Sequence, residues 1–310
     1  FVCEQLGLQG RADLMTTDFR MLVEQKSGSN YNIQQGRPNH FGSYQKEDHY
    51  VQLLLYYGVL DRNFRLAPGS IDIRLLYSKY ALPGGLVVVN DYHELFCEAM
   101  RFRNKVVAQE MAMAREGFER VLPQLRPDIL NEKGLQTDFF KKWILPRLTE
   151  MTWPLQQLPH LEKLYYTRMM TFVYREQLAS KVGTQEGKSG CMADLWNMPL
   201  AEKRETGNIY TGLSIIKKTS SGPYTGFDLI TLSVPKQGDD FLPNFRCGDT
   251  VYLYAYEEDR EPDVTKALLF KASLVDISSQ QLTVHLNDGQ QNADVIEQVP
   301  YRLKNGSRPV

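Results

Sequence analysis

The spacing of apolar residues changes twice along the chain and divides it into three regions. In the first region, apolar runs bounded by Gly, Pro, Asn or Asp predict strands over residues 5–15, 19–26, 71–80 and 85–89. The last of these runs has no polar position, so we expect that strand to be buried on both faces. Helical spacing predicts a helix over 46–60, and the Asn- and Gly-rich segment 29–45 predicts a loop. Residues 1–92 are therefore expected to form an α/β core, a mixed sheet flanked by helices.

Helical spacing dominates the second region, residues 93–190, which we expect to pack on the first. A long helix is expected from Asp91, an N-cap residue followed three positions later by Glu94, to about Leu122. More helix is expected over 138–182, broken at Pro146, Pro154 and Pro159. We expect the aromatic residues of that stretch to form a helical core rather than a platform for stacked bases: Phe139, Phe140, Trp143, Tyr165, Tyr166, Phe172 and Tyr174.

From about Asn208 the apolar period becomes two, which is typical of strands. Five strands are expected, over 209–218, 227–235, 250–258, 264–278 and 280–287. Gly-Asp at 248–249 and Asp-Gly at 288–289 predict tight turns. Several short strands at this spacing indicate a small antiparallel β-barrel within a barrel and stalk region, residues 191–310. This region has no cluster of acids, histidines or cysteines in the sequence, so we expect a binding or spacer module.

Composition limits the classes of function. The formal net charge is −1 over 310 residues, so any nucleic-acid contact needs a local basic patch. The strip Arg101, Arg103 and Lys105 is either such a patch or an ordinary solvated face. No apolar run is long enough for a membrane span, and no signal peptide is recognisable. We expect no membrane partner, and the chain looks like an excerpt of a longer protein.

The four cysteines lie far apart in the sequence, at positions 3, 97, 191 and 247. Their spacing matches neither a zinc site nor an iron–sulfur site, so we expect no iron–sulfur cluster. It also argues against a disulfide framework and favours a reduced, cytoplasmic setting. We expect the protein to be bacterial.

A glycine-rich loop over 183–193 invites comparison with a phosphate-binding loop. That motif needs four residues between its first two glycines and a strand before it. Here only three residues separate Gly183 from Gly187, and a helix precedes the loop. We therefore expect no ATP site in this chain and interpret the loop as a flexible linker.

Chemically useful side chains concentrate between Gly10 and Gly28. This segment predicts a strand, a polar turn over 16–18 and a second strand. Side chains two apart on a strand share a face, so Glu24 and Lys26 project together and Gln25 points the other way.

A turn at 17–18 brings Asp13 beside Glu24 on the neighbouring strand. Two carboxylates suit Mg²⁺ or Mn²⁺, and a lysine beside the metal can orient a water or offset charge on a phosphate. The alternative is an ordinary hairpin with a solvated Glu and Lys on one face. The helix over 46–60 adds Gln52 and Tyr56, which share a face, with His49 close by. Taken alone, these positions are typical of a core helix.

Together these residues resemble the RecB-like branch of the PD-(D/E)XK nuclease superfamily. Gly10-Arg11-Ala12-Asp13 resembles its Gly-x-x-Asp strand, Glu24-Gln25-Lys26-Ser27-Gly28 its Glu-x-Lys-Ser-Gly strand, and Gln52 with Tyr56 its Gln-x-x-x-Tyr helix. The rest of the chain resembles the nuclease–helicases that trim DNA flaps, in which a helical region and a small barrel follow the nuclease and lead to a superfamily 1 motor.

The resemblance implies hydrolysis of phosphodiesters in single-stranded or flapped DNA. It implies that Asp13 and Glu24 bind Mg²⁺ or Mn²⁺, with the Gln25 carbonyl as a further ligand. It also implies that Lys26 acts on the attacking water, while Gln52 and Tyr56 hold the lysine or the DNA backbone. A helicase motor is expected in the same parent polypeptide. Two alternatives stay open: an inactive nuclease fold that serves as a scaffold or DNA-binding region, and a restriction-type or repair nuclease with its own barrel.

Overall fold

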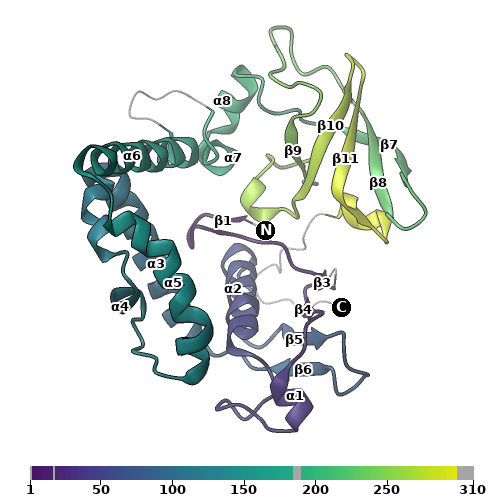
Figure 1. Cartoon of the computed structure of the whole chain (residues 1–310). Helices are drawn as coiled ribbons and strands as arrows, with labels where there is room; N and C mark the ends of the chain where they lie inside the picture. Colours follow the sequence, from purple (N-terminus) through teal and green to yellow (C-terminus); the bar gives the residue numbers. More distant parts are fainter. Residues whose placement is uncertain (1, 17, 184–189, 299–310) are drawn as a thin grey trace. The chain divides into compact units, whose positions relative to one another are not determined.

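The computed structural model describes residues 2–16, 18–183 and 190–298 (Figure 1). Contacts divide the chain into two compact units, Phe1–Ala99 with Leu195–Val310, and Met100–Asp194. Both larger sheets belong to the first unit, and the second is helical. No helix within the described ranges is long and apolar enough to cross a membrane. Thr17 of the expected turn and most of the glycine-rich loop, residues 184–189, lie outside the described residues.

A four-stranded mixed sheet occupies the N-terminal part of the first unit, in the order β3-β4-β5-β6. Its strands are β3 Leu14–Met15, β4 Met21–Lys26, β5 Asp72–Tyr77 and β6 Leu86–Val89. β4 pairs antiparallel with β3 and parallel with β5, and β5 pairs antiparallel with β6. The mixed sheet expected from the sequence is confirmed.

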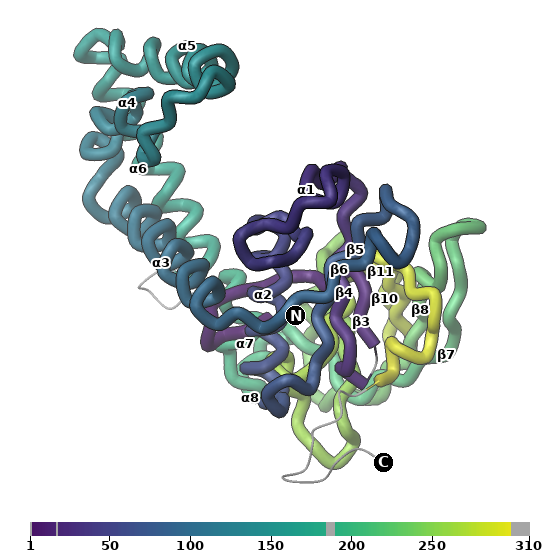
Figure 2. The backbone as a smooth tube through the Cα atoms, turned by 90° about the horizontal axis from the view of Figure 1, so that it is seen from below, coloured from purple at the N-terminus to yellow at the C-terminus, as the bar shows by residue number. Residues whose placement is uncertain are grey.

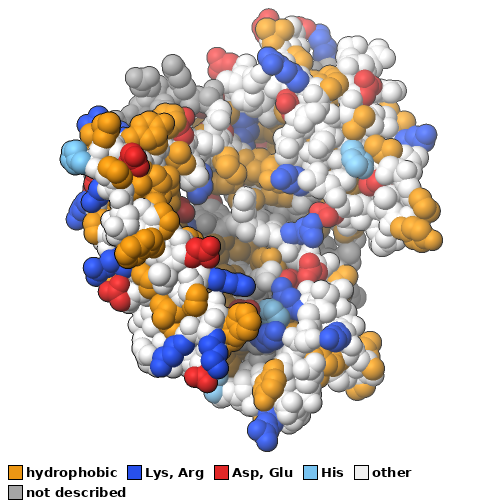
Figure 3. Space-filling model, viewed as in Figure 1, with side chains coloured by type: hydrophobic (Ala, Val, Ile, Leu, Met, Phe, Trp, Pro, Cys, Tyr) orange, Lys and Arg blue, Asp and Glu red, His pale blue; other side chains and the backbone are white. Residues whose placement is uncertain are grey.

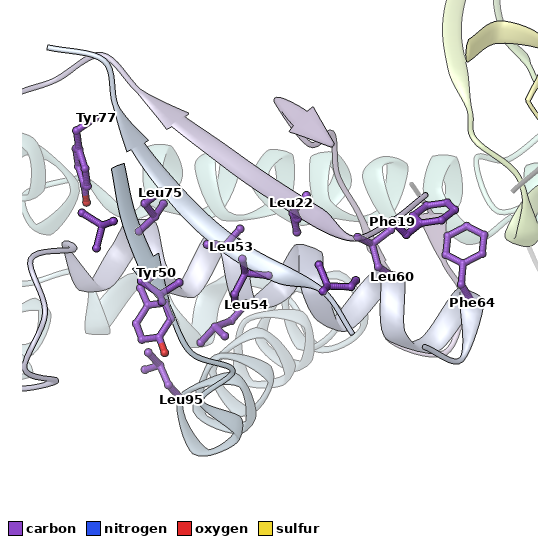
Figure 4. Packing of buried hydrophobic residues seen from close by; sticks show 14 of the residues in the cluster. Phe19, Leu22, Tyr50, Leu53, Leu54, Leu60, Phe64, Leu75, Tyr77 and Leu95 are labelled. Atoms are coloured by element: carbon purple, nitrogen blue, oxygen red, sulfur yellow. The ribbon is translucent and has the colours of Figure 1, made fainter. Parts of the chain in front are cut away.

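Parallel pairing of β4 and β5 requires a crossover, because a tight turn cannot join the same ends of two parallel strands. The crossover contains α1 Tyr31–Gln35 and α2 Glu47–Phe64. The helix α2 confirms the expected helix and runs four residues further. It buries one face against the sheet, as the labelled side chains in Figure 4 show. The most deeply buried members of this core include Leu22, Leu53, Leu54, Leu60, Leu75 and Tyr77.

The single strand expected over 5–15 is wrong. The structure has β1 Val2–Cys3 and β2 Leu8–Gln9, which pair with each other, and then the separate strand β3. A turn closes β1 onto β2, with the Gly7 N–H donating to the Glu4 carbonyl at 3.0 Å and Gly7 at φ 58°. Gly adopts positive φ at little cost, so it divides the expected strand.

Burial of β6 on both faces is also wrong. This strand lies at the edge of the sheet, with Val87 and Val89 buried and Val88 58% exposed. Apolar runs of four residues carry no periodicity that separates an edge strand from a central one.

The helix α3, His93–Glu116, begins in the first unit and continues in the second. It is shorter at both ends than the expected 91–122, and Gly117 at φ 102° follows it. Short helices and then longer ones come next: η1 Phe118–Arg120, η2 Leu122–Gln124, α4 Pro127–Leu130, the π-helical η3 Phe140–Ile144, α5 Leu145–Gln156 and α6 His160–Val182. Pro146 lies in the first turn of α5 and Pro159 caps α6, but the break expected at Pro154 is wrong because α5 continues through it.

Within the second unit, α3 and α6 lie side by side and run in opposite directions (Figure 2). The Arg175 guanidinium donates to the Ala114 carbonyl at 2.8 Å, and the Phe118 N–H donates to Thr171 Oγ1 at 2.9 Å. Thr167 and Thr171 are both buried on α6. Their side chains are small, so the backbone at Phe118 can approach α6 closely.

The expectation that seven aromatic residues form a helical core is mostly wrong. Only Phe140 is buried, while Phe139, Trp143, Tyr165 and Phe172 are more than half exposed. Threonines occupy the buried side of α6, and Tyr166 and Tyr174 pack on the buried Phe118. Tyr165 and Phe172 point outward instead. Leu161, Tyr165, Met169 and Phe172 follow helical spacing and form an exposed apolar stripe. Figure 3 shows hydrophobic side chains gathered at the surface of these helices.

A second sheet of five antiparallel strands forms the C-terminal part of the first unit, in the order β7-β8-β11-β10-β9. After α7 Asp194–Asn197 and α8 Leu200–Glu205 come β7 Ser214–Thr219, β8 Phe227–Ser233, β9 Thr250–Leu253, η4 Val264–Lys266, β10 Phe270–Ile277, β11 Gln281–Gln290 and η5 Ala293–Glu297. The five expected strands are present, but β7 and β10 begin five and six residues later than expected and β9 ends five residues earlier. Among the described residues β7 does not pair with β9, so the sheet is not shown to close into a barrel.

The two turns expected in this sheet have different outcomes. Gly248, at φ 94°, lies in a turn just before β9. Asp288 and Gly289 instead lie inside β11, so the turn expected there is wrong. A Cβ at Gly289 would lie 1.8 Å from the Thr225 carbonyl oxygen, so this glycine permits a close approach of two chain segments.

Candidate functional site

The candidate site lies on the face of β4 that α2 covers. Leu22, Glu24 and Lys26 alternate along this face. Leu22 is fully buried in the core, Glu24 is 3% exposed, and the Lys26 side chain is partly accessible. The apolar surface of the strand thus passes into a charged pair at its C-terminal end. The Lys26 ammonium donates to Glu24 Oε1 at 2.7 Å.

Asp13 lies immediately before β3 and approaches this pair from the neighbouring strand. In the antiparallel register, Leu14 is paired with Val23 and Met15 with Leu22. Extended by one residue, the same register places Asp13 opposite Glu24. Asp13 Oδ2 accepts the backbone N–H of Gln25 at 2.8 Å, which fixes the carboxylate against β4. The juxtaposition of Asp13 with Glu24 expected from the sequence is confirmed.

Glu24 is buried with a raised pKa and with one carboxylate oxygen that has no hydrogen-bond partner among the described residues. Burial is the main reason that its pKa lies above the usual value; a hydrogen bond from Lys26 opposes the shift, and the charge of Asp13 adds to it. Glu24 Oε2 is buried and has no hydrogen-bond partner within the described part of the chain. A buried acceptor without a partner is costly, and a cation at this oxygen would satisfy it.

These residues fit a divalent cation in part. Within residues 2–16, 18–183 and 190–298, no group of three or more His, Cys, Asp or Glu side chains could hold a metal ion. The carboxylates of Asp13 and Glu24 would supply two side-chain ligands at most, and backbone carbonyls or waters would have to supply the rest. Mg²⁺ commonly binds through one or two carboxylates and keeps several waters, so the incomplete side-chain set suits it.

Lys26 also connects β4 to α2. Its ammonium donates to Gln52 Oε1 at 2.7 Å, and Gln52 Nε2 donates to the Tyr56 hydroxyl at 2.9 Å. Glu24, Lys26, Gln52 and Tyr56 thus form one continuous series of hydrogen bonds, which we call the relay. The sequence predicted each of its members, and the structure brings all four together with Asp13.

Tyr77 fixes the position of α2 against the sheet. It is paired with Lys26 in the β4–β5 register and is fully buried. Its hydroxyl accepts the Lys46 backbone N–H at 3.0 Å, at the start of α2, and lies 3.1 Å from His49 Nδ1. Burial lowers the pKa of His49, and the charge of Lys26 lowers it further.

His40 is not part of the relay. It is exposed in the segment between α1 and α2, where its ring contacts Phe41 and its Nε2 lies 3.8 Å from Glu47. This segment is more ordered than a loop assignment suggests. Asn30 is fully buried, caps α1 through its side chain and donates to the Tyr44 carbonyl at 2.8 Å.

One polar group in the second sheet was missed from the sequence. The buried Asp228 accepts the Ser221 N–H at 2.7 Å and lies 3.2 Å from His285 Nε2. Burial alone would raise the pKa of Asp228, but bonds from Ser221 and His285 outweigh it and lower the pKa to about 2. The three residues come from separate segments and share no motif. The carboxylate lies between the other two and stabilises the turn before β8.

All four cysteines are free thiols: Cys3 is buried, Cys97 and Cys191 are half-buried, and Cys247 is exposed. None of them belongs to the candidate site, which consists of Asp13 and the relay. A scan against protein-family models and a search of curated proteins both found no match to this chain.

Proposed function

We propose that this chain is a metal-dependent nuclease of the PD-(D/E)XK type, in its RecB-like branch, that hydrolyses phosphodiesters of single-stranded or flapped DNA. One observation carries the proposal: Asp13, Glu24 and the rest of the relay converge from β3, β4 and α2. An incidental surface hairpin would leave Glu24 in solvent, whereas Glu24 is 3% exposed.

Asp13 and Glu24 would hold Mg²⁺ or Mn²⁺, with the Gln25 carbonyl as a further ligand. The bound ion would supply Lewis acidity toward a phosphate oxygen and a water of lowered pKa. Lys26 would orient that water and offset negative charge on the phosphate. Two of the lysine's N–H groups already point to Glu24 and Gln52, so its third is directed by their geometry.

We further propose that the chain belongs to a larger superfamily 1 nuclease–helicase and that the five-stranded sheet is its small barrel. Support comes from the order of an α/β core, a helical unit and an antiparallel sheet. The chain by itself would need no ATP.

Purified chain with Mn²⁺ is expected to cut labelled single-stranded DNA. Glu24→Ala and Lys26→Ala should each abolish cutting, while Lys133→Ala, which changes an exposed lysine of the helical unit, should not. Thermal unfolding would verify that each variant is folded. Equal cutting by wild type and both site variants would refute the assignment. DNA binding without cutting by wild type would favour the second candidate, an inactive scaffold.

A further inference from the structure

Exposed aromatic residues are concentrated in the helical unit, Met100–Asp194, which the proposed nuclease site does not use. Six of its ten aromatic side chains are more than half exposed: Phe102, Phe139, Trp143, Trp153, Tyr165 and Phe172. Elsewhere among the described residues, only Tyr31 and Tyr224 are exposed to that degree. Single exposed apolar residues are normal on a protein surface, whereas a concentration of them marks a binding surface.

The helical unit is also the basic part of the chain. It contains 15 Lys and Arg against 11 Asp and Glu, a formal net charge of +4. The rest of the chain contains 21 Lys and Arg against 26 Asp and Glu, a net charge of −5. A symmetric contact between two helical units would bring like charges together, whereas an anionic partner would be attracted. Charge therefore favours an anionic partner over a second copy of this unit.

The exposed apolar stripe of α6 combines flat rings with a positive charge. Tyr165, Arg168 and Phe172 follow one another at spacings of three and four residues, so they share one face of the helix. All three side chains are exposed. With a rise of 1.5 Å per residue, the two aromatic residues lie about 10 Å apart along the helix axis, with Arg168 between them. Figure 3 shows Lys and Arg side chains beside apolar ones on the surface of these helices.

The chemistry of this stripe distinguishes a single strand from a duplex. In a duplex the face of each base is covered by the neighbouring base pairs, whereas a single strand can place its bases on aromatic side chains. We propose that single-stranded DNA binds along α6, with its bases stacked on Tyr165 and Phe172 and its phosphates beside Arg168. The choice of DNA as the anionic partner rests on the proposed nuclease function. The stripe would hold the strand by contacts that need neither the metal ion nor the relay.

Fluorescence anisotropy of the full chain with a labelled single-stranded oligonucleotide tests this surface. EDTA removes divalent metal, so the strand stays intact and contacts bridged by metal are excluded. Tyr165→Ala and Phe172→Ala should each lower the affinity by about tenfold, the scale of one stacked base, whereas Phe172→Trp should retain it. Replacing the bases of the oligonucleotide by abasic sites should cause a similar loss. Arg168→Ala should reduce by about one the slope of log K against log salt concentration.

Leu161→Ala is the matched control. Leu161 lies on the same stripe, one turn before Tyr165, and is 75% exposed, but its side chain has no flat ring. This variant should bind DNA as wild type does, and thermal unfolding would verify that every variant is folded. A loss of affinity as large as that of Tyr165→Ala would overturn the stacking role and indicate a general apolar surface. Unchanged affinity in both ring variants would overturn the proposal and leave the stripe to a protein partner.

The two proposals fail differently. If wild type cuts DNA with Mn²⁺ and both ring variants bind and cut equally well, the stacking surface is refuted and the nuclease assignment stands. If wild type binds DNA in EDTA through Tyr165 and Phe172 but does not cut with Mn²⁺, the nuclease assignment is refuted and the stacking surface stands. Tighter binding of single-stranded RNA than of DNA would overturn the choice of DNA.

Discussion

Replacing Glu24 by Gln should make the metal-free protein more stable. In wild type, Glu24 Oε2 is a buried acceptor with no partner among the described residues, and such a group costs about 1–3 kcal/mol. A glutamine keeps an oxygen for Lys26 and places an amide donor within reach of the Asp13 carboxylate. We expect Glu24→Gln to raise the free energy of unfolding by about 1 kcal/mol. The corresponding rise in Tm is about 1.5 °C, because the entropy of unfolding is about 2.1 cal/mol/K per residue.

Mn²⁺ should reverse this order. A ligand present at about 100 times its Kd stabilises the folded state by about 2.7 kcal/mol. Wild type should gain this stability because both carboxylates are charged, whereas the neutral amide of Glu24→Gln should gain little. Glu24→Gln should therefore be the more stable protein without metal, and wild type the more stable protein with Mn²⁺.

Differential scanning calorimetry with and without Mn²⁺ measures this exchange directly. Because the folded protein holds the Glu24 proton more tightly than the unfolded chain, wild type loses stability as the pH rises through the raised pKa. The advantage of Glu24→Gln should thus be small in acid and grow toward neutral pH. Glu98→Gln, at an exposed position on α3, controls for the loss of one negative charge. A metal-free Glu24→Gln that is less stable than wild type at neutral pH, or that keeps the full Mn²⁺ effect, would refute the reasoning.

Two other changes test the surroundings of the site and the second sheet. Tyr77→Phe removes the hydroxyl that bonds Lys46 and His49, so urea unfolding should show a loss of about 1–3 kcal/mol; a loss under about 0.5 kcal/mol would mean that α2 is held by packing alone. Asp228, with its pKa lowered to about 2, contributes stability above its unfolded pKa and loses that contribution as the pH falls through its folded pKa. Asp228→Asn should therefore flatten the fall of stability in acid, and an unchanged pH profile would contradict this role.

Side-chain alternation and helix spacing predicted which of the candidate site residues share a face, whereas their selection as a site came from the resemblance to a family's motifs. Glu24 and Lys26 share a face because they lie two apart on β4, and Gln52 and Tyr56 share one because they lie four apart on α2. The sequence could not supply the contact between these two elements. The bond from Lys26 to Gln52 joins residues 26 positions apart, and it depends on how α2 packs on the sheet.

The wrong predictions for β6 and for the aromatic residues of α6 both concern burial. The local spacing of apolar residues does not determine which side chains other elements cover. Val88 belongs to an apolar run yet faces solvent, because it points to the opposite face of β6 from the buried Val87 and Val89. Tyr165 and Phe172 are exposed because Thr167 and Thr171 occupy the side of α6 that meets its neighbour. Gly10 was recognised as part of a motif, but its steric relation to Tyr56 appears only in three dimensions.

The parallel pairing of β4 with β5 determines the order in which the site can form during folding. The β3–β4 hairpin is local and can bring Asp13 to Glu24 while the chain is still emerging from the ribosome. Lys26 cannot be fixed from both sides until Tyr77, 51 residues later, has been synthesised and α2 has closed over the strand. The approach of Asp13 to β4 therefore involves only residues 13–25, whereas the bond from Lys26 to Gln52 requires α2 as well.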